Sequence, residues 1–179
     1  PRAVKEGMAK GWSIDFETTD PFTGRRWDLS QVSQQRHVMK LIATHKPYMV
    51  ALSAPCTMYS PLQNLNKKKG STEWDLKKRK AGVLLKFAMD VAKVQSANGR
   101  YFMFEHPIGA TSWQLPSGTD VAMMKDVDVC TVDMCAYGLK SQDRFGEGAA
   151  RKRTRLMSNM PALIEGMPRQ CEGGHRHVI

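Results

Sequence analysis

The sequence predicts an α/β domain with a mostly parallel sheet and helices on both faces of that sheet. Two continuous apolar runs, 48–52 and 101–104, are typical of parallel strands that are buried on both sides. A long amphipathic segment at 73–97 separates them, and strands that alternate with helices favour parallel pairing. Hydrophobic residues make up 41% and charged residues 25% of the chain, which is ordinary globular usage and excludes disordered and fibrous classes.

The first predicted elements lie before the second apolar run. Residues 11–16 predict a short strand, and Pro21 and Gly24 then mark a turn. Apolar residues recur at helical spacing over 29–45, which predicts a helix. The apolar run at 48–52 predicts a buried strand that ends before Pro55.

The later elements begin with the clearest helix, over 73–97, which Asn98 and Gly99 close. The run at 101–104 predicts the second buried strand, and we expect the two apolar runs to be adjacent central strands of the sheet. Weaker patterns predict a short helix at 121–124 and strands at 127–134 and 156–157. We expect one catalytic domain over 1–160 and a C-terminal tail over 161–179 that carries a Cys/His metal cluster.

Charge and cysteine content suggest the partner and the compartment. Lys and Arg number 27 against 17 Asp and Glu, a net charge of +10, which predicts a nucleic-acid partner. No apolar run approaches the roughly 20 residues that cross a bilayer, so we expect no membrane partner. The cysteines are too few and scattered for a disulfide scaffold, so we expect reduced thiols in the cytoplasm or nucleus. They are Cys56, Cys130, Cys135 and Cys171.

Two candidate catalytic residues follow the two buried strands, where the working loops of α/β sheets lie. Cys56 comes after Pro55 and before a loop rich in hydroxyl, amide and lysine groups, which suits a nucleophilic thiolate. The alternative is a buried cysteine that acts as a small hydrophobe. Glu105 follows four apolar residues and suits a general acid, or else a carboxylate that caps the next loop. His106 is a candidate base, but the rigid turn at Pro107 favours Glu105.

Other charged residues are candidates for binding. Arg153 and Arg155 lie on one face of the last predicted strand and suit contacts with phosphates or base edges, although a solvated basic edge would look the same. Acids that follow the first strand and turn could accept ribose hydroxyls, but single acids after strands are common. These acids are Asp15, Glu17 and Asp28.

The C-terminal tail contains metal-ligand residue types. Cys171, His175 and His177 are zinc-type donors, and Cys135 or Cys130 would complete a set of four. The spacing differs from that of a standard zinc finger. We expect Cys171, His175 and His177 to converge with Cys135 at about 2.0–2.3 Å from one metal ion.

Three segments together resemble motifs of the DNA cytosine-5 methyltransferase family, in the family's order. SAPCTMYSPLQNLN is similar to the strand, Pro-Cys and mobile loop, YFMFEHP to the strand before Glu-Asn-Val, and RKRTRLMSN to Gln-x-Arg-x-Arg. The resemblance covers roughly 11–159. Thr57 replaces the usual Gln, His106-Pro107 replaces Asn-Val, and Arg151 replaces the first Gln of the third motif. A Gly-rich cofactor loop and a target-recognition domain are not visible.

The resemblance implies a shortened Rossmann-like methyltransferase that transfers a methyl group from S-adenosylmethionine to C5 of cytosine in flipped DNA bases. It implies that Cys56 adds to C6, Glu105 supports protonation at N3, and Arg153, supported by Arg155, holds the base or its phosphate. The implied cofactor contacts are Asp15, Glu17, Asp28 and Pro55. It further implies that the lysines at 67–69 follow the DNA backbone, with DNA preferred over RNA.

Two other functions fit the same residues. One is a non-catalytic basic nucleic-acid-binding domain, that is, a degenerate methyltransferase stabilised by a structural zinc ion. In this interpretation Cys56 has no chemical role. The other is a different thiol enzyme that uses Cys56 with His106. In the methyltransferase interpretation, Cys56, Glu105 and Arg153 should line a single pocket, with Asp15 and Asp28 on its cofactor side.

Overall fold

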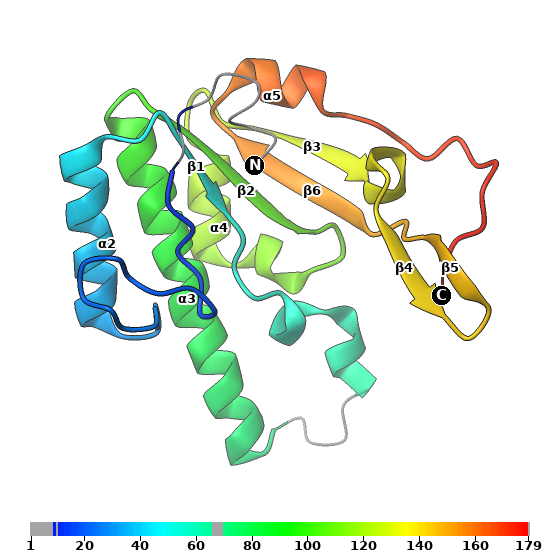
Figure 1. Cartoon of the computed structure of the whole chain (residues 1–179), viewed down its shortest axis with the longest axis horizontal. Coiled ribbons are helices and arrows are strands. Elements are labelled where there is room, and N and C mark those ends of the chain that lie inside the picture. Colours follow the sequence, from blue (N-terminus) through cyan, green and yellow to red (C-terminus); the bar gives the residue numbers. More distant parts are fainter. Residues whose placement is uncertain (1–8, 10, 66–69, 179) are drawn as a thin grey trace. The chain divides into compact units, whose positions relative to one another are not determined.

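The computed structural model describes residues 9, 11–65 and 70–178, and the chain divides into two compact units, Pro1–Pro47 and Tyr48–Ile179 (Figure 1). The first unit contains the predicted helix, α2 (Val32–His45). The strand predicted at 11–16 is absent from the described residues of this unit. There the Thr18 hydroxyl bonds to the Ser13 and Asp15 carbonyls, and these local bonds replace a strand ladder with a turn.

The second unit contains a mixed four-stranded sheet, so the predicted mostly parallel, Rossmann-like sheet is wrong. Its strand order is β1-β2-β6-β3. In the described residues only β1 and β2 pair in parallel, and β6 pairs antiparallel with both β2 and β3. The strands are β1 (Met49–Leu52), β2 (Tyr101–Pro107), β3 (Asp128–Asp133) and β6 (Arg153–Ser158).

The antiparallel pairing of β3 with β6 follows from the connection between these two strands. This connection holds a short 3₁₀ helix, η4 (Met134–Tyr137), and a hairpin of β4 (Lys140–Asp143) and β5 (Gly146–Ala149). A parallel pair needs a crossover, usually helical, whereas this connection returns the chain for antiparallel pairing. The two apolar residues of β6, Leu156 and Met157, fit either strand direction.

The adjacency of the two apolar runs is confirmed, with Met49 opposite Tyr101 and Leu52 opposite Phe104. However, β1 is at the edge of the four-stranded sheet instead of at its centre. The buried side chains Phe102 and Phe104 of β2 pack with Met157 of β6. Their common packing partner is α3 (Thr72–Ala97), through Leu85 and Met89.

The predicted helix at 73–97 is therefore confirmed as α3, and its start has a clear cause. The Ser71 hydroxyl accepts a hydrogen bond from the Trp74 amide and caps the first turn. The short helix expected at 121–124 overlaps only the last two residues of α4 (Pro116–Ala122), which begins at Pro116. Two more 3₁₀ segments, η1 (Thr57–Tyr59) and η2 (Pro61–Leu65), follow β1, and η3 (Thr111–Gln114) follows β2.

The tail after α5 (Pro161–Gly166) is ordered by hydrogen bonds to the hairpin. The Ala149 amide donates to the Arg176 carbonyl, and the Val178 amide donates to the Ala149 carbonyl, both at 2.9 Å. The tail therefore runs parallel to β5 at the bridge between Ala149 and His177. Among the described helices, none combines the length and the apolar character that a bilayer span requires.

Candidate metal centre

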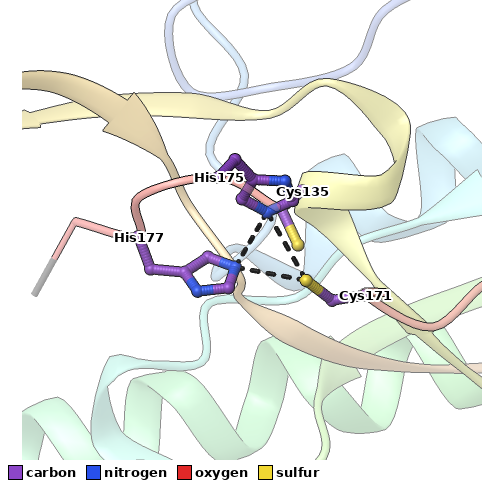
Figure 2. A group of neighbouring side chains, drawn as sticks. All are labelled: Cys135, Cys171, His175 and His177. Atoms are coloured by element: carbon purple, nitrogen blue, oxygen red, sulfur yellow. Dashed lines mark hydrogen bonds between the residues drawn. The ribbon is translucent and has the colours of Figure 1, made fainter. Parts of the chain in front are cut away.

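Four side chains from two separate segments meet beside the hairpin (Figure 2). Cys135 is buried in η4, directly after β3. Cys171, His175 and His177 come from the tail. Between them, Gly173 and Gly174 have φ angles of 83° and 75°, which other residues rarely adopt, and this turn directs the histidines back toward Cys171.

The distances between these side chains suit one metal ion. Their ligand atoms all lie within 4.8 Å of one another. Cys171 Sγ is 3.4 Å from the Nε2 atoms of His175 and His177, which are 3.0 Å apart. Bound at ordinary lengths, a tetrahedral zinc ion holds its ligand atoms about 3.3–3.8 Å apart, so small side-chain adjustments would complete the site. The four predicted ligands can thus hold a metal ion.

The alternative fourth ligand, Cys130, lies outside this group, on β3 opposite Leu156. Cys135, which belongs to the group, has a thiol whose protonation is affected by its surroundings. Burial raises the pKa of the Cys135 thiol, and its hydrogen bond to Cys171 acts in the same direction. Because a metal ion binds the thiolate, metal binding must release this proton.

Asp133 connects the tail to the sheet. Its carboxylate is almost fully buried and accepts a 2.9 Å hydrogen bond from the Cys171 amide, while its own amide donates to the Arg169 carbonyl at 2.8 Å. The Cys171 amide is the main cause that lowers the pKa of Asp133, and Arg151 and Arg153 act in the same direction. Asp133 therefore stays ionised in the interior and fastens the segment that supplies a ligand.

The same carboxylate receives two arginines. Arg153 Nε is 3.1 Å from one carboxylate oxygen and Arg151 Nε is 3.4 Å from the other. The arginine side chains remain 46% and 52% exposed. Arg155, by contrast, lies over the Trp113 ring at 5.2 Å. Sequence reasoning missed Asp133, although an acid two residues before a predicted cysteine ligand is a usable signal for a supporting residue.

Arg176 lies between the two histidine ligands and binds the hairpin turn. One terminal nitrogen bonds to both carboxylate oxygens of Asp143, at 3.0 and 2.8 Å. The other bonds to the carbonyls of Gly146 and Glu147, at 2.7 and 3.0 Å. A Cβ at Gly148 would lie 3.0 Å from this guanidinium, so the close contact favours glycine there. The tail segment that carries His175 and His177 is therefore attached to the hairpin through the hydrogen bonds of Arg176.

The candidate catalytic residues lie elsewhere: Cys56 follows β1, whereas Glu105 lies inside β2, because this strand continues past the predicted 101–104 to Pro107. Cys56 is half-buried and precedes η1. Glu105 Oε1 accepts a 2.9 Å hydrogen bond from the Ser53 hydroxyl and is 3.8 Å from Lys152 Nζ. In the described part of the chain, no hydrogen bond or ion pair joins Cys56 to Glu105. The Ser53–Glu105 bond instead joins the two strands directly after their last parallel pair, Leu52 and Phe104.

His106 has a structural role that the sequence did not indicate. It is fully buried, with Nδ1 at 2.6 Å from the Ser112 hydroxyl and Nε2 at 2.9 Å from the Ala54 carbonyl. Burial lowers the pKa of His106, which favours the neutral ring. A neutral ring donates from Nε2 to Ala54 and accepts from Ser112 at Nδ1. It thereby holds the loop that leads to Cys56.

The sheet register separates Glu105 from the arginines. Glu105 is opposite Leu156, whereas His106 is opposite Arg155, and Arg153 shares the face of Arg155. Because side chains alternate between the faces of a strand, Glu105 projects from one face and the two arginines from the other. The structure thus does not bring Glu105 and Arg153 together in one pocket.

The predicted cofactor acids lie in the first unit and have local partners. Asp15 accepts a hydrogen bond from the Glu17 amide at 3.0 Å. Asp28 accepts from the amide and hydroxyl of Ser30 at 3.0 and 2.6 Å, which shapes the turn before α2. Pro55 precedes Cys56 in the loop after β1. The lysines at 67–69 lie outside the described residues.

No protein-family model, curated protein or solved structure matches this chain. The resemblance to cytosine-5 methyltransferases therefore depends on the three short motifs alone. The geometry around Cys135 and the tail is independent of that resemblance.

Proposed function

We propose that this chain is a basic nucleic-acid-binding domain built on a structural zinc centre formed by Cys135, Cys171, His175 and His177. The observation that carries the proposal is the convergence of these four side chains within 4.8 Å. Structural zinc sites have four protein ligands, whereas catalytic zinc keeps one position open for water or substrate. Four protein donors therefore favour a structural role.

The donor types favour zinc over other common ions. Two thiolates and two imidazoles are the ligands of structural zinc, whereas calcium and magnesium prefer oxygen. Zinc would join the tail to η4 and so fix Cys171. Because the Cys171 amide bonds to Asp133, the ion would also stabilise the carboxylate that holds Arg151 and Arg153.

The basic segment supports a polyanionic partner. Asp133 engages the Nε–H groups of Arg151 and Arg153 while both side chains stay about half exposed, and Lys152 between them is 45% exposed. Guanidinium groups held in this way can donate their terminal N–H groups to phosphates. The net charge of +10 adds a sequence-independent attraction.

The test combines metal analysis with binding at several salt concentrations. Purified wild-type protein should contain one zinc per chain and bind a labelled 20-base-pair DNA with an affinity that falls steeply as salt rises. Arg151→Ala with Lys152→Ala should weaken binding and flatten the salt dependence. The matched control is Lys77→Ala with Lys86→Ala, which removes the same charge from α3. Protein without zinc, or without salt-dependent binding, would overturn the proposal.

Cytosine methylation is a second candidate, favoured by one observation. Cys56 and Glu105 both come shortly after the last parallel pair of β1 and β2, and His106 holds Ala54 in the loop before Cys56. Cys56 would add to C6 of a flipped cytosine while Glu105 supports the proton at N3. S-adenosylmethionine would supply the methyl group.

The test of methylation is covalent trapping on DNA that contains 5-fluorocytosine, because fluorine blocks the elimination that releases Cys56. With S-adenosylmethionine present, wild-type protein should form a complex that survives denaturation. Cys56→Ser should not form it, and Cys130→Ser should. Wild-type protein that binds the DNA and the cofactor without trapping would reject this candidate and leave the zinc-centred proposal intact.

A further inference from the structure

The hairpin of β4 and β5 ends in an exposed aromatic ring. Phe145 is 69% exposed, and the Arg144 guanidinium carbon lies 4.6 Å from its ring centroid. The other residues of 140–149 are polar, glycine or alanine. In the described part of the chain, no carboxylate lies within ion-pair distance of Arg144. The tip therefore presents one large ring together with one uncompensated positive charge.

The tip is also held in place before any partner binds. Asp143 accepts a 2.8 Å hydrogen bond from the Phe145 amide and pairs with Arg176, which also bonds to the Gly146 carbonyl. Gly146 has a φ of 99°, a conformation that allows the turn. Because Arg176 lies between His175 and His177, a metal ion bound by these histidines would further restrain the hairpin that Arg176 contacts. A ring positioned in this way loses little conformational entropy when it binds.

We propose that Arg144 and Phe145 form a base-stacking site for single-stranded nucleic acid. This inference rests on the proposed function of the domain. Aromatic rings stack with any base, and arginine adds cation–π and phosphate contacts. In the chain, β5 leads from this tip to Arg151, which lies no more than about 22 Å from Phe145 even in an extended conformation. A single strand can therefore place a base on Phe145 and its phosphates along the basic segment.

The same features argue against a protein partner and against intact duplex at the tip. Protein interfaces use clustered apolar anchors surrounded by a rim, whereas Phe145 is the one large apolar residue of 140–149. In a duplex the base faces are already stacked, so reaching one costs unstacking energy. Single strands present these faces directly.

The experiment measures the affinity of a labelled 12-nucleotide single-stranded DNA of mixed sequence, and of the corresponding duplex, at one fixed salt concentration. Phe145→Ala should bind the single strand about tenfold more weakly, the lower part of the range for loss of one stacked base. Its loss for the duplex should be less than twofold. Phe145→Trp should retain wild-type affinity. Met123→Ala removes a comparably exposed apolar side chain, 77% exposed, and should change neither affinity.

The outcomes separate this inference from the proposed function. If wild-type protein binds neither DNA, the proposed function fails. If wild-type protein binds with salt dependence but Phe145→Ala binds the single strand equally well, the stacking site is wrong and the proposed function remains. Equal losses for single strand and duplex would reject the single-strand assignment. Zinc content and circular dichroism of Phe145→Ala should match the wild type, because Phe145 is an exposed tip residue outside the ligand set and the core.

Discussion

The metal centre and the loop that carries Cys56 were both predicted as functional sites, but the structure organises their polar groups differently. At the candidate metal centre, the four donor atoms point toward one another and lie within 4.8 Å of one another (Figure 2). Beside the loop after β1, Ser53 and the β2 residues Glu105 and His106 each bond to neighbouring structure. Convergent Cys and His donors can bind one metal ion together, whereas groups already bonded to the chain hold the fold. The comparison favours a binding role for the first region and a positioning role for the second.

The largest expected effect tests the metal centre itself. Cys171→Ser should lose stoichiometric zinc and lower the free energy of unfolding by several kcal/mol, because the tail and hairpin lose their common anchor. Metal analysis and thermal unfolding, with and without a chelator, measure both effects. The control is Cys130→Ser. Because Cys130 lies outside the cluster, this variant should retain the metal. If Cys171→Ser kept zinc and stability, the contrast between the two regions would disappear.

The second effect concerns the connection between the metal centre and the basic segment. Asp133→Asn keeps the shape of the side chain but leaves Arg151 and Arg153 without their carboxylate, and it weakens the bond to the Cys171 amide. We expect a loss of about 3 kcal/mol in the free energy of unfolding, because one partner of a buried ionic network is removed. Zinc affinity should fall about tenfold, as for other supporting residues.

Urea unfolding and competition with a zinc-binding dye measure these two losses. Asp143→Asn is a matched control that removes a carboxylate from the Arg176 contact at the hairpin instead of from the buried network. It should cost less stability than Asp133→Asn, because the Asp133 carboxylate is more deeply buried, 1% exposed against 12%. If Asp143→Asn lost more unfolding free energy than Asp133→Asn, the tail would be held mainly by the hairpin contact of Arg176 and not by Asp133.

The third effect tests the positioning role at the other region. His106→Ala removes a fully buried ring and leaves the Ala54 carbonyl and Ser112 hydroxyl without this partner, which should cost about 3 kcal/mol in urea unfolding. Ser112→Ala removes only one of the two bonds and should cost about 1 kcal/mol.

The loop should respond as well. Since His106 holds Ala54, two residues before Cys56, His106→Ala should make the Cys56 thiol react faster with a maleimide reagent, as measured by peptide mass spectrometry. Cys130 provides an internal reference within the same protein. An unchanged Cys56 rate in a folded His106→Ala protein would show that His106 does not hold this loop.

The sequence predicted local features better than long-range ones. The helix at 73–97, the pairing of 48–52 with 101–104, and the meeting of Cys171, His175 and His177 with Cys135 depend on periodicity or on ligand chemistry, which short segments display. The direction of β6 depends on its connection to β3, and its apolar residues look alike in parallel and antiparallel pairs.

The roles of individual charged residues were also hidden in the sequence. Arg153 fits a phosphate contact and an internal ion pair equally well until the position of Asp133 is known. Glu105 and Arg153 lie on opposite faces because β6 is antiparallel in this register, and motif order alone cannot reveal a face. His106 replaces an amide of the resembled motif, but only its contacts with Ala54 and Ser112 explain what it does here.

The smallest expected effect is a pH dependence that originates at His106. Burial lowers its folded-state pKa below the ordinary value of 6.5 and Lys152 acts in the same direction, against the smaller upward effects of the Ala54 carbonyl bond and Glu105. The unfolded chain therefore binds the proton first as the pH falls below 6.5, and protonation stabilises the unfolded state. The contribution of His106 is thus fully present above pH 6.5 and declines toward the folded-state pKa.

His175 and His177 would add their own pH dependence through metal binding, so the measurement is made on metal-free protein. Urea unfolding of the Cys171→Ser protein between pH 7.5 and 5.5 should show that the free energy of unfolding decreases as the pH is lowered. Adding His106→Gln should make this decrease smaller, because the proton that His106 takes up on unfolding no longer contributes to the slope. The glutamine side chain is polar and does not titrate in this range, so the slope change reports protonation of the histidine ring. Equal slopes in the two proteins would mean that His106 binds its proton equally well in the folded and unfolded chain, which would contradict a neutral ring bridging Ala54 and Ser112.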